Sequence, residues 1–401
     1  MTVEYKSNIP YTWEVRSKYL DLPFSETEYE NRVNRMKGEM TKKGIDSLLV
    51  FGNPHDKGDV VYLSNFYPFG RAALIIRKEE AAPVLITDGI LHGEPINSYS
   101  WMTWLRDFRP VHRDAAEFAA AIAQVLKEDR ATKVGIVGMD NLPGNIWDRL
   151  KEALKEVTWE DFWYPFTTAK SIRSAREVSL LKEAGRITAG GMKAAIEAIS
   201  EGSTEHGIAA AANKEMFELG AHELFFSTIV NAGPRGGLKH AYPTGRRLRA
   251  GDLIYLDMGA SRYGYNCDMS RSVVLGGANA EQRAVLNVIL DGYTVLTGKM
   301  KPGVSTREII EEATRLERSS GLMEKYRGRI FLGLAIHHAV GTSFAEFPTL
   351  GFPETILREN MTFAFEPMAH ILDFGTAVIE NMILITGSGQ ESITPLEIVH
   401  W

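Results

Sequence analysis

The chain has 401 residues, of which 44% are hydrophobic and 24% are charged, and its formal net charge is -6 at pH 7. This length predicts two domains, because single cores stop growing at about 250–300 residues. The negative charge argues against a nucleic-acid-binding protein, and the chain contains no apolar run long enough to cross a bilayer, so no membrane partner is expected. A single cysteine, Cys267, argues against a disulfide framework. Together with a first stretch that lacks an apolar signal core, it predicts a cytoplasmic location.

The first part of the chain alternates between helix and strand patterns. Ser25 and Glu28 form a capping box that opens a helix through about residue 43, with Gly44 as its stop. Another helix is expected around residues 115–127. Short apolar runs typical of buried strands occupy residues 47–51, 60–63, 72–76, 83–86 and 134–137. The alternation predicts a small α/β domain over residues 1–165.

The second part, residues 166–401, opens with another capping box, formed by Ser174 and Glu177. Further helices are expected over about 204–219 and 280–300. The dipeptide Ser-Thr precedes a helix pattern at 203–204 and again at 305–306, which suggests a duplicated α+β half.

Two carboxylates flank a predicted turn in the middle of this second domain. Strands around Asp257 and Asp268 are joined by a turn near residues 261–264. If the turn is centred between Arg262 and Tyr263, the two acids lie opposite each other, with Cβ atoms about 4.5–5.5 Å apart. Like charges at that distance repel unless a cation lies between them.

A second predicted hairpin repeats this arrangement near the end of the chain. Folded about Asp373, it sets Glu366 opposite Glu380, and the intervening sequence offers an imidazole from His337 or His338. Four carboxylates and one histidine suit two divalent ions, with Mn²⁺ preferred and Fe²⁺, Co²⁺ or Zn²⁺ as alternatives. Two dications would balance the four negative charges.

The ordered set of these motifs resembles the pita-bread metallohydrolases, the family of prolidase, aminopeptidase P, methionine aminopeptidase and creatinase. The resemblance covers nearly the whole second domain and implies an α/β N-terminal domain followed by an α+β pita-bread catalytic domain. The metal ligands that it implies are Asp257, Asp268, His338, Glu366 and Glu380. It also implies that Glu366 acts as general base or proton shuttle and that His240 orients the substrate or moves a proton. His337 is then expected as a neighbour of the ligands that contacts substrate, and Arg271 as an ion-pair partner of the metal carboxylates.

The first domain is similar to that of creatinase, on the segment from Tyr62 to Arg71. In creatinase the matching Phe-Gly-Arg contacts the substrate carboxylate across a dimer, so the resemblance implies a homodimer and a substrate contact from Arg71. Two positions depart from the pattern. Ala345 stands where the family peptidases carry a second histidine, and Thr349 stands where creatinase carries a second arginine.

These features favour a dinuclear-metal hydrolase that cleaves a C–N bond in a small carboxylate-bearing substrate, with Xaa-Pro dipeptidase as the nearest activity. One alternative is a creatinase-like amidinohydrolase or amidohydrolase, or a metal-dependent lyase, that acts on a non-peptide small molecule. Another is a non-catalytic protein-binding module, which is disfavoured because such relatives lose the metal ligands that this chain retains.

Overall fold

The computed structural model describes residues 12–78, 82–91, 94–95, 103–332, 336–343, 346–349 and 354–401. The chain divides into two compact units, residues 1–170 and 171–401. This division lies at the end of α6 (Trp163–Lys170), a helix that spans the boundary expected after residue 165. Within the described ranges, we find no helix with the length and apolar character needed to cross a membrane.

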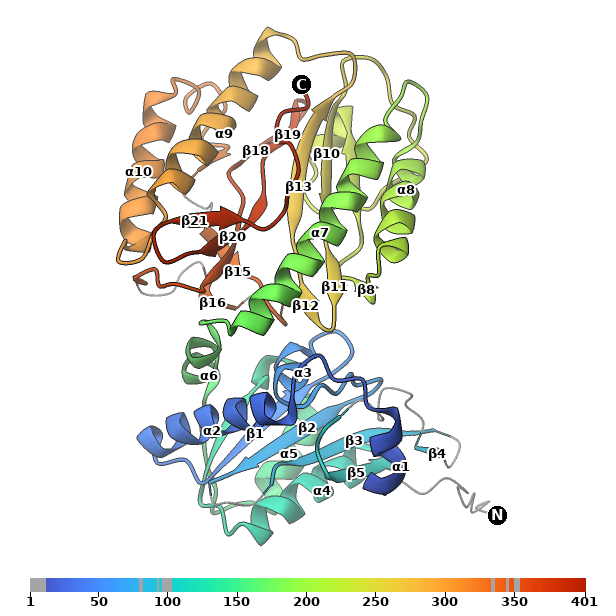
Figure 1. The fold of residues 1–401 in the computed structure, drawn as a ribbon, viewed down its shortest axis with the longest axis vertical. Helices are drawn as coiled ribbons and strands as arrows, with labels where there is room; N and C mark the ends of the chain where they lie inside the picture. The colour runs from blue at the N-terminus through green and yellow to red at the C-terminus, as the bar shows by residue number, and fades with distance from the viewer. Residues whose placement is uncertain are drawn as a thin grey trace. The chain divides into compact units, whose positions relative to one another are not determined.

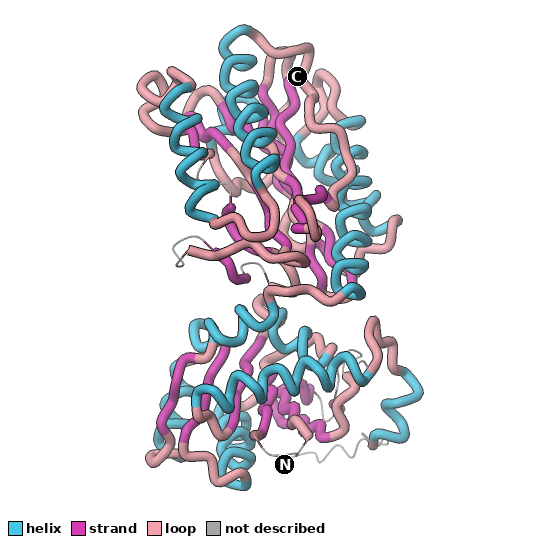
Figure 2. Tube along the Cα trace, turned by 60° about the vertical axis from the view of Figure 1, so that its left-hand side comes forward, coloured by secondary structure: helices cyan, strands magenta, loops and turns pink. Residues whose placement is uncertain are grey.

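A mixed sheet forms the centre of the first unit (Figure 1, Figure 2). Its order within the described residues is β4-β3-β2-β1-β6-β7, and β5 pairs with β3. Helices α4 and α5 bury apolar side chains against one face of this sheet. The strands are β1 (Ser47–Gly52), β2 (Ala72–Arg77), β3 (Val84–Leu91), β4 (Glu94–Pro95), β5 (Asp107–His112), β6 (Lys133–Val137) and β7 (Thr158–Asp161). With α6, the helices are α1 (Trp13–Arg16), α2 (Glu26–Lys43), α3 (Gly58–Ser64), α4 (Ala115–Glu128) and α5 (Gly144–Ala153).

The first predicted helix is confirmed, and one predicted strand is wrong. The Ser25 hydroxyl accepts a hydrogen bond from the Glu28 amide at 3.2 Å, and Gly44 ends α2 in the left-handed conformation. Residues 60–63, predicted as a strand, lie inside α3 instead. All four are buried, so the segment has no polar face that would reveal a helical period. A short apolar run of this kind fits a buried helix as well as a buried strand.

The second unit consists of two similar halves, each with two helices packed on antiparallel strands (Figure 1). In the first half, α7 (Ala175–Glu197) and α8 (Glu205–Glu218) share an apolar core with the strands around β10. In the second, α9 (Ala280–Lys299) and α10 (Thr306–Ser319) share a core with β17 and β20. The strands of the first half are β8 (Glu223–Leu224), β9 (Ile229–Ala232), β10 (Leu253–Met258), β11 (Ala260–Arg262), β12 (Tyr265–Asn266) and β13 (Met269–Val274). Those of the second half are β14 (Ile330–Phe331), β15 (Ile336–Ala339), β16 (Glu346–Thr349), β17 (Thr362–Phe365), β18 (Met368–Ile371), β19 (Gly375–Val378), β20 (Asn381–Ile385) and β21 (Gln390–Ser392).

The strand faces that the helices leave uncovered meet each other between the two halves. A bridge between Arg271 and Ile379 joins the halves edge to edge. Tyr255 from β10 packs with Met368 and Val378 from the second half in a small apolar cluster. Because side chains alternate along a strand, residues two positions from Tyr255 face this interior as well. Asp257 is one of them.

The predicted helix starts of the second unit are confirmed. Ser174 and Glu177 form the expected capping box at α7. Thr204 caps α8, and Ser305 caps α10 in a capping box of its own. The repeated Ser-Thr pattern therefore marks a helix start in each half, although the cap is its second residue at α8 and its first residue at α10.

Candidate metal centre

The first carboxylate hairpin forms, but its register differs from the prediction. Asp257 pairs with Ser270, so it does not lie opposite Asp268. The turn is centred between Tyr263 and Gly264, one residue later than expected, and these residues have φ of 50° and 75°. A two-residue hairpin turn of type I′ needs positive φ at both central positions, and glycine provides this readily at the second.

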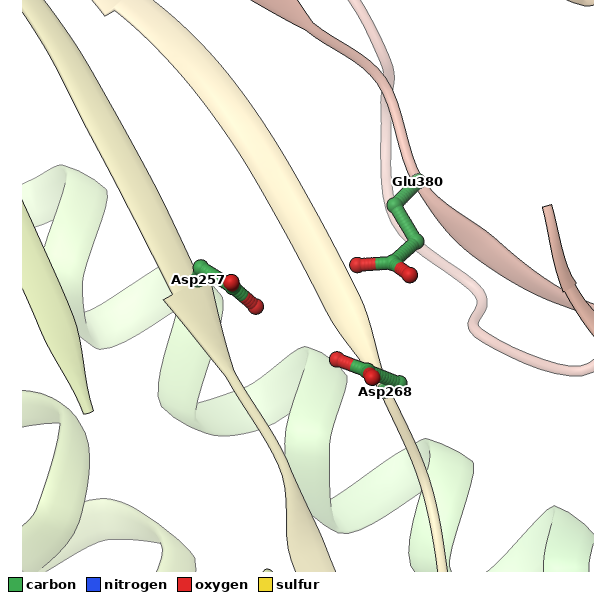
Figure 3. Close-up of side chains that lie close together, drawn as sticks. All are labelled: Asp257, Asp268 and Glu380. Carbon is green, nitrogen blue, oxygen red and sulfur yellow. The ribbon is translucent and has the colours of Figure 1, made fainter. Parts of the chain in front are cut away.

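Asp268 is therefore a diagonal neighbour of Asp257 on the same face of the hairpin. Diagonal positions lie about 7–8 Å apart at the backbone, which carboxylate side chains can bridge by leaning toward each other. Oxygen atoms of Asp257, Asp268 and Glu380 lie within 4.8 Å of one another. Figure 3 shows the three carboxylates directed toward a common space, Asp257 from β10, Asp268 from the residue before β13 and Glu380 from the residue before β20.

The second carboxylate hairpin has the predicted register. Met368 pairs with Val378 on one side, and Phe365 pairs with Asn381 on the other. The same register places Glu366 opposite Glu380, at the point where the ladder passes from β18 and β19 to β17 and β20. Asp373 lies in the turn with φ of 65°.

His338 joins these acids from the neighbouring strand β15, which pairs with β17. Its Nε2 atom lies 3.9 Å from the nearer carboxylate oxygen of Asp268. The backbone of His337 lies in β15, but its side chain, for which a substrate contact is predicted, lies outside the part of the structure that is described. Ala345 also lies outside the described residues.

One pocket of about 400 Å³ is lined by His240 and the five predicted metal ligands, and its volume suits a small ligand. The four carboxylates and His338 are each at most 6% exposed. The described residues that line the pocket are Phe226, Ser227, Ile229, Lys239, His240, Ala241, Tyr242, Asp257, Asp268, His338, Glu366 and Glu380. The structure thus brings together His240 and all five predicted ligands.

Burial of the acids among like charges strongly favours their neutral forms. Burial raises the pKa of Asp257 to about 6, and burial together with Asp257 raises the pKa of Glu380 to about 8. The pKa values of Asp268 and Glu366 are raised well above their usual range, by burial and then by the neighbouring carboxylates. Four buried acids in one place are costly to ionise unless cations lie among them.

The donor set fits divalent cations. Within the described residues, the Oδ1 atoms of Asp257 and Asp268 are buried and have no hydrogen-bond partner. A bound cation would satisfy both atoms. Four carboxylates with one imidazole form the oxygen-rich set that hard and borderline divalent ions prefer.

Other side chains hold the acids in place. The Tyr255 hydroxyl donates to Oδ2 of Asp257 at 2.5 Å, and the Ser270 hydroxyl donates to Oε2 of Glu380 at 2.7 Å. Arg271 was expected to pair with the metal carboxylates, but it donates to the main-chain oxygen of Glu380 at 2.7 Å instead. Strand alternation explains the difference, because Arg271 follows Ser270 and points to the opposite face. Tyr255 was missed in the sequence, although its spacing of two from Asp257 places it on the same face.

His240 lies on the pocket wall in the segment that follows the 3-10 helix over residues 233–237. Its backbone is left-handed, with φ of 59°. Burial, and then the charge of Lys239, lowers the pKa of His240. The imidazole is therefore neutral at pH 7 and can donate or accept one hydrogen bond at each nitrogen according to its tautomer.

Arg71 lies in the first unit, where its guanidinium forms an ion pair with the buried Asp88. Its charge also lies 5.3 Å from the centre of the Phe118 ring. These contacts give Arg71 a structural role within its own unit. The substrate contact predicted for it stays a prediction.

Comparisons with known proteins agree with this architecture. The sequence model of metallopeptidase family M24 matches residues 179–387, and that of the creatinase/prolidase N-terminal domain matches residues 32–173. The chain is 27% identical over 369 residues to a Xaa-Pro dipeptidase of Pyrococcus horikoshii, which covers 91% of this chain and 97% of the relative. It is 31% identical over 227 residues to a Xaa-Pro dipeptidase of Pyrococcus furiosus, which covers 56% of this chain and 64% of the relative.

Solved structures show the same fold. The prolidase from Pyrococcus horikoshii OT3 superposes with a TM-score of 0.79 at 26% identity, over 92% of this chain and 100% of that one. A Xaa-Pro dipeptidase from Bacillus anthracis superposes with a TM-score of 0.77 at 25% identity, over 92% and 99% of the two chains. The expected fold class, an α/β N-terminal domain followed by an α+β pita-bread domain, is confirmed.

Proposed function

The chain belongs to metallopeptidase family M24 and is a metal-dependent hydrolase, and we propose that its substrates are Xaa-Pro dipeptides. The observation that carries this proposal is the convergence of four buried carboxylates and His338 on one pocket of about 400 Å³. A dipeptide fits a pocket of that volume. The similarity to Xaa-Pro dipeptidases along 91% of the chain supports the same substrate class.

In this proposal, the metal ligands are Asp257, Asp268, His338, Glu366 and Glu380, and they hold two divalent ions, with Mn²⁺ preferred. The ions would supply Lewis acidity, which lowers the pKa of a water nucleophile and polarises the scissile carbonyl. The unsatisfied Oδ1 atoms of Asp257 and Asp268 support this assignment.

The chain's own groups position the reactants and move the protons. Glu366 would accept a proton from the attacking water through its carboxylate and pass it to the departing proline nitrogen. His240, neutral at pH 7, would donate a hydrogen bond from one ring nitrogen to the carbonyl oxygen as negative charge develops there. Tyr255 and Ser270 would keep their two carboxylates in a fixed orientation.

Three finer features belong to the same proposal. The preference for Mn²⁺ rests on the oxygen-rich donor set. A homodimer is implied by the creatinase-like segment around Arg71. A cytoplasmic location fits a chain whose one cysteine, Cys267, is buried and free.

The test measures proline release from Gly-Pro and Ala-Pro by the Mn²⁺-reconstituted protein, with creatine as a parallel substrate and bound metal counted by plasma emission. We expect proline release that Asp268→Asn abolishes together with bound metal. Asp291→Asn makes the same chemical change at an exposed site on α9 and should leave both unchanged. A protein that binds metal but cleaves neither dipeptide would refute the proposed substrate, and turnover of creatine would identify the alternative.

A further inference from the structure

A lysine lies on the wall of the pocket beside the acidic cluster. Among the described residues that line the pocket, Lys239 is the one lysine or arginine. Its ammonium lies 3.5 Å from the sulfur of Met368, a weak hydrogen-bond acceptor. Within the described part of the chain, this ammonium forms no ion pair with a carboxylate. The Lys239 ammonium is therefore a half-buried cation, and the contact with Met368 uses only one of its three N–H donors.

The backbone holds Lys239 at this place. Asn231 donates a side-chain hydrogen bond to the main-chain oxygen of Leu238 at 3.0 Å. On the same segment, a Cβ on Gly237 would lie 2.8 Å from the main-chain oxygen of Ile371, so the segment approaches the β18–β19 turn closely. Both contacts lie within two residues of Lys239, so they define the backbone position from which its side chain reaches Met368 at the start of β18.

The charge balance of the pocket favours an anionic ligand. Four ionised carboxylates would be neutralised by two dications, and Lys239 then adds one positive charge to the pocket. A dipeptide that ends in proline carries its carboxylate one carbon away from the scissile nitrogen. A cation that recognises this carboxylate must therefore lie in the same pocket as the groups that cleave the bond, as Lys239 does.

We infer that Lys239 binds the carboxylate of the substrate and thereby selects dipeptides over longer peptides and amides. This inference rests on the proposed function and deepens it. In a longer peptide the proline carboxylate is an amide, which lacks the charge that an ammonium recognises. The competing interpretation is that Lys239 serves only to offset the acidic cluster, since its charge opposes the raised pKa values of Asp257, Glu366 and Glu380.

The two interpretations differ in what Lys239→Met changes. If Lys239 binds the carboxylate, we expect the KM for Gly-Pro to rise about 10- to 100-fold, the size of a lost charged hydrogen bond. The kcat for Gly-Pro, both constants for Gly-Pro amide and the number of bound metal ions should stay within about threefold. Lys239→Arg should restore part of the affinity, because it keeps the charge. Lys193→Met, at an exposed position on α7, is the matched control.

Binding of L-proline and L-prolinamide to the Mn²⁺-loaded protein, followed by calorimetry, gives a readout that needs no turnover. Lys239→Met should weaken proline binding and leave prolinamide binding unchanged. Equal losses for the two ligands, or loss of bound metal, would overturn the inference. If the wild-type protein cleaves neither dipeptide, the proposed function fails. The proline titration then still tests the role of Lys239. Carboxylate binding by Lys239 is refuted if Lys239→Met binds proline as tightly as the wild type, or if the wild type binds no proline.

Discussion

Removal of divalent ions should make the stability of the second unit fall as the pH rises. Burial raises the pKa of Glu380 from 4.5 to about 8. A group whose pKa is raised on folding holds its proton longer in the folded state, so its contribution to stability is lost as the pH rises toward the folded value. In metal-free protein between pH 6.5 and 8, Glu380 is protonated when folded and ionised when unfolded.

The size of the effect follows from that window. For each proton that the folded state retains, the free energy of unfolding falls by about 1.36 kcal/mol per pH unit. Glu380 alone therefore lowers the free energy of unfolding by about 2 kcal/mol between pH 6.5 and 8. Asp268 and Glu366 act in the same direction. His240 and His370 have lowered pKa values in the folded state, so they oppose this trend weakly: their unfolded forms still lose protons just above pH 6.5. For a unit of this size, 2 kcal/mol lowers Tm by about 4–8 °C.

The assay is thermal unfolding followed by circular dichroism, at several pH values from 6.5 to 8, with EDTA or with Mn²⁺. In EDTA we expect the Tm to fall across this range. With Mn²⁺ the acids are ionised in both states, so the Tm should stay level or rise. The double variant Asp268→Asn, Glu380→Gln should flatten the EDTA profile. A wild-type Tm in EDTA that is constant or rises from pH 6.5 to 8 would refute the assignment of buried, mutually repelling acids.

Two further substitutions test the surroundings of the site. Tyr255→Phe removes the hydrogen bond to Asp257 and should weaken metal binding about 10-fold in a chelator competition, whereas Tyr265→Phe, which also removes a buried hydroxyl, should not. Arg173→Met leaves the buried carboxylate of Glu346 without its ion-pair partner. It should lower the free energy of unfolding, measured with denaturant, by about 3–5 kcal/mol. Replacement of both residues by apolar ones should recover most of that loss.

The local sequence pattern was sufficient to predict hairpins, in which residues close in sequence pair with each other. The hairpin around Asp373 was predicted in its correct register, because the apolar alternation of its two strands and the turn at Asp373 agree on one centre. The hairpin before it was misplaced by one residue. Composition favours Tyr263–Gly264 over Arg262–Tyr263, because glycine readily adopts the positive φ that a type I′ turn needs at its second position, and the backbone angles show that this pair forms the turn.

Features that depend on segments distant in sequence could not be predicted in this way. Nothing near Lys239 indicates that its ammonium lies beside Met368, since that contact joins two halves of the unit. The ion pair between Arg173 and Glu346 is equally distant. The five side chains that the motif order singles out nevertheless line one pocket, with two carboxylates from each hairpin and His338 from β15.

The origin of the site in two halves has a consequence for how the protein folds. Ser270 and Glu380, joined by a buried hydrogen bond, are 110 residues apart in sequence. Each hairpin can form locally and early, but the space between them exists only after the halves dock, and docking across such a separation is slow. The complete set of candidate metal ligands therefore forms only after the two halves have docked on their apolar cores. A divalent ion held by groups from both halves would stabilise the docked state, and we expect metal affinity to be lost when the halves separate.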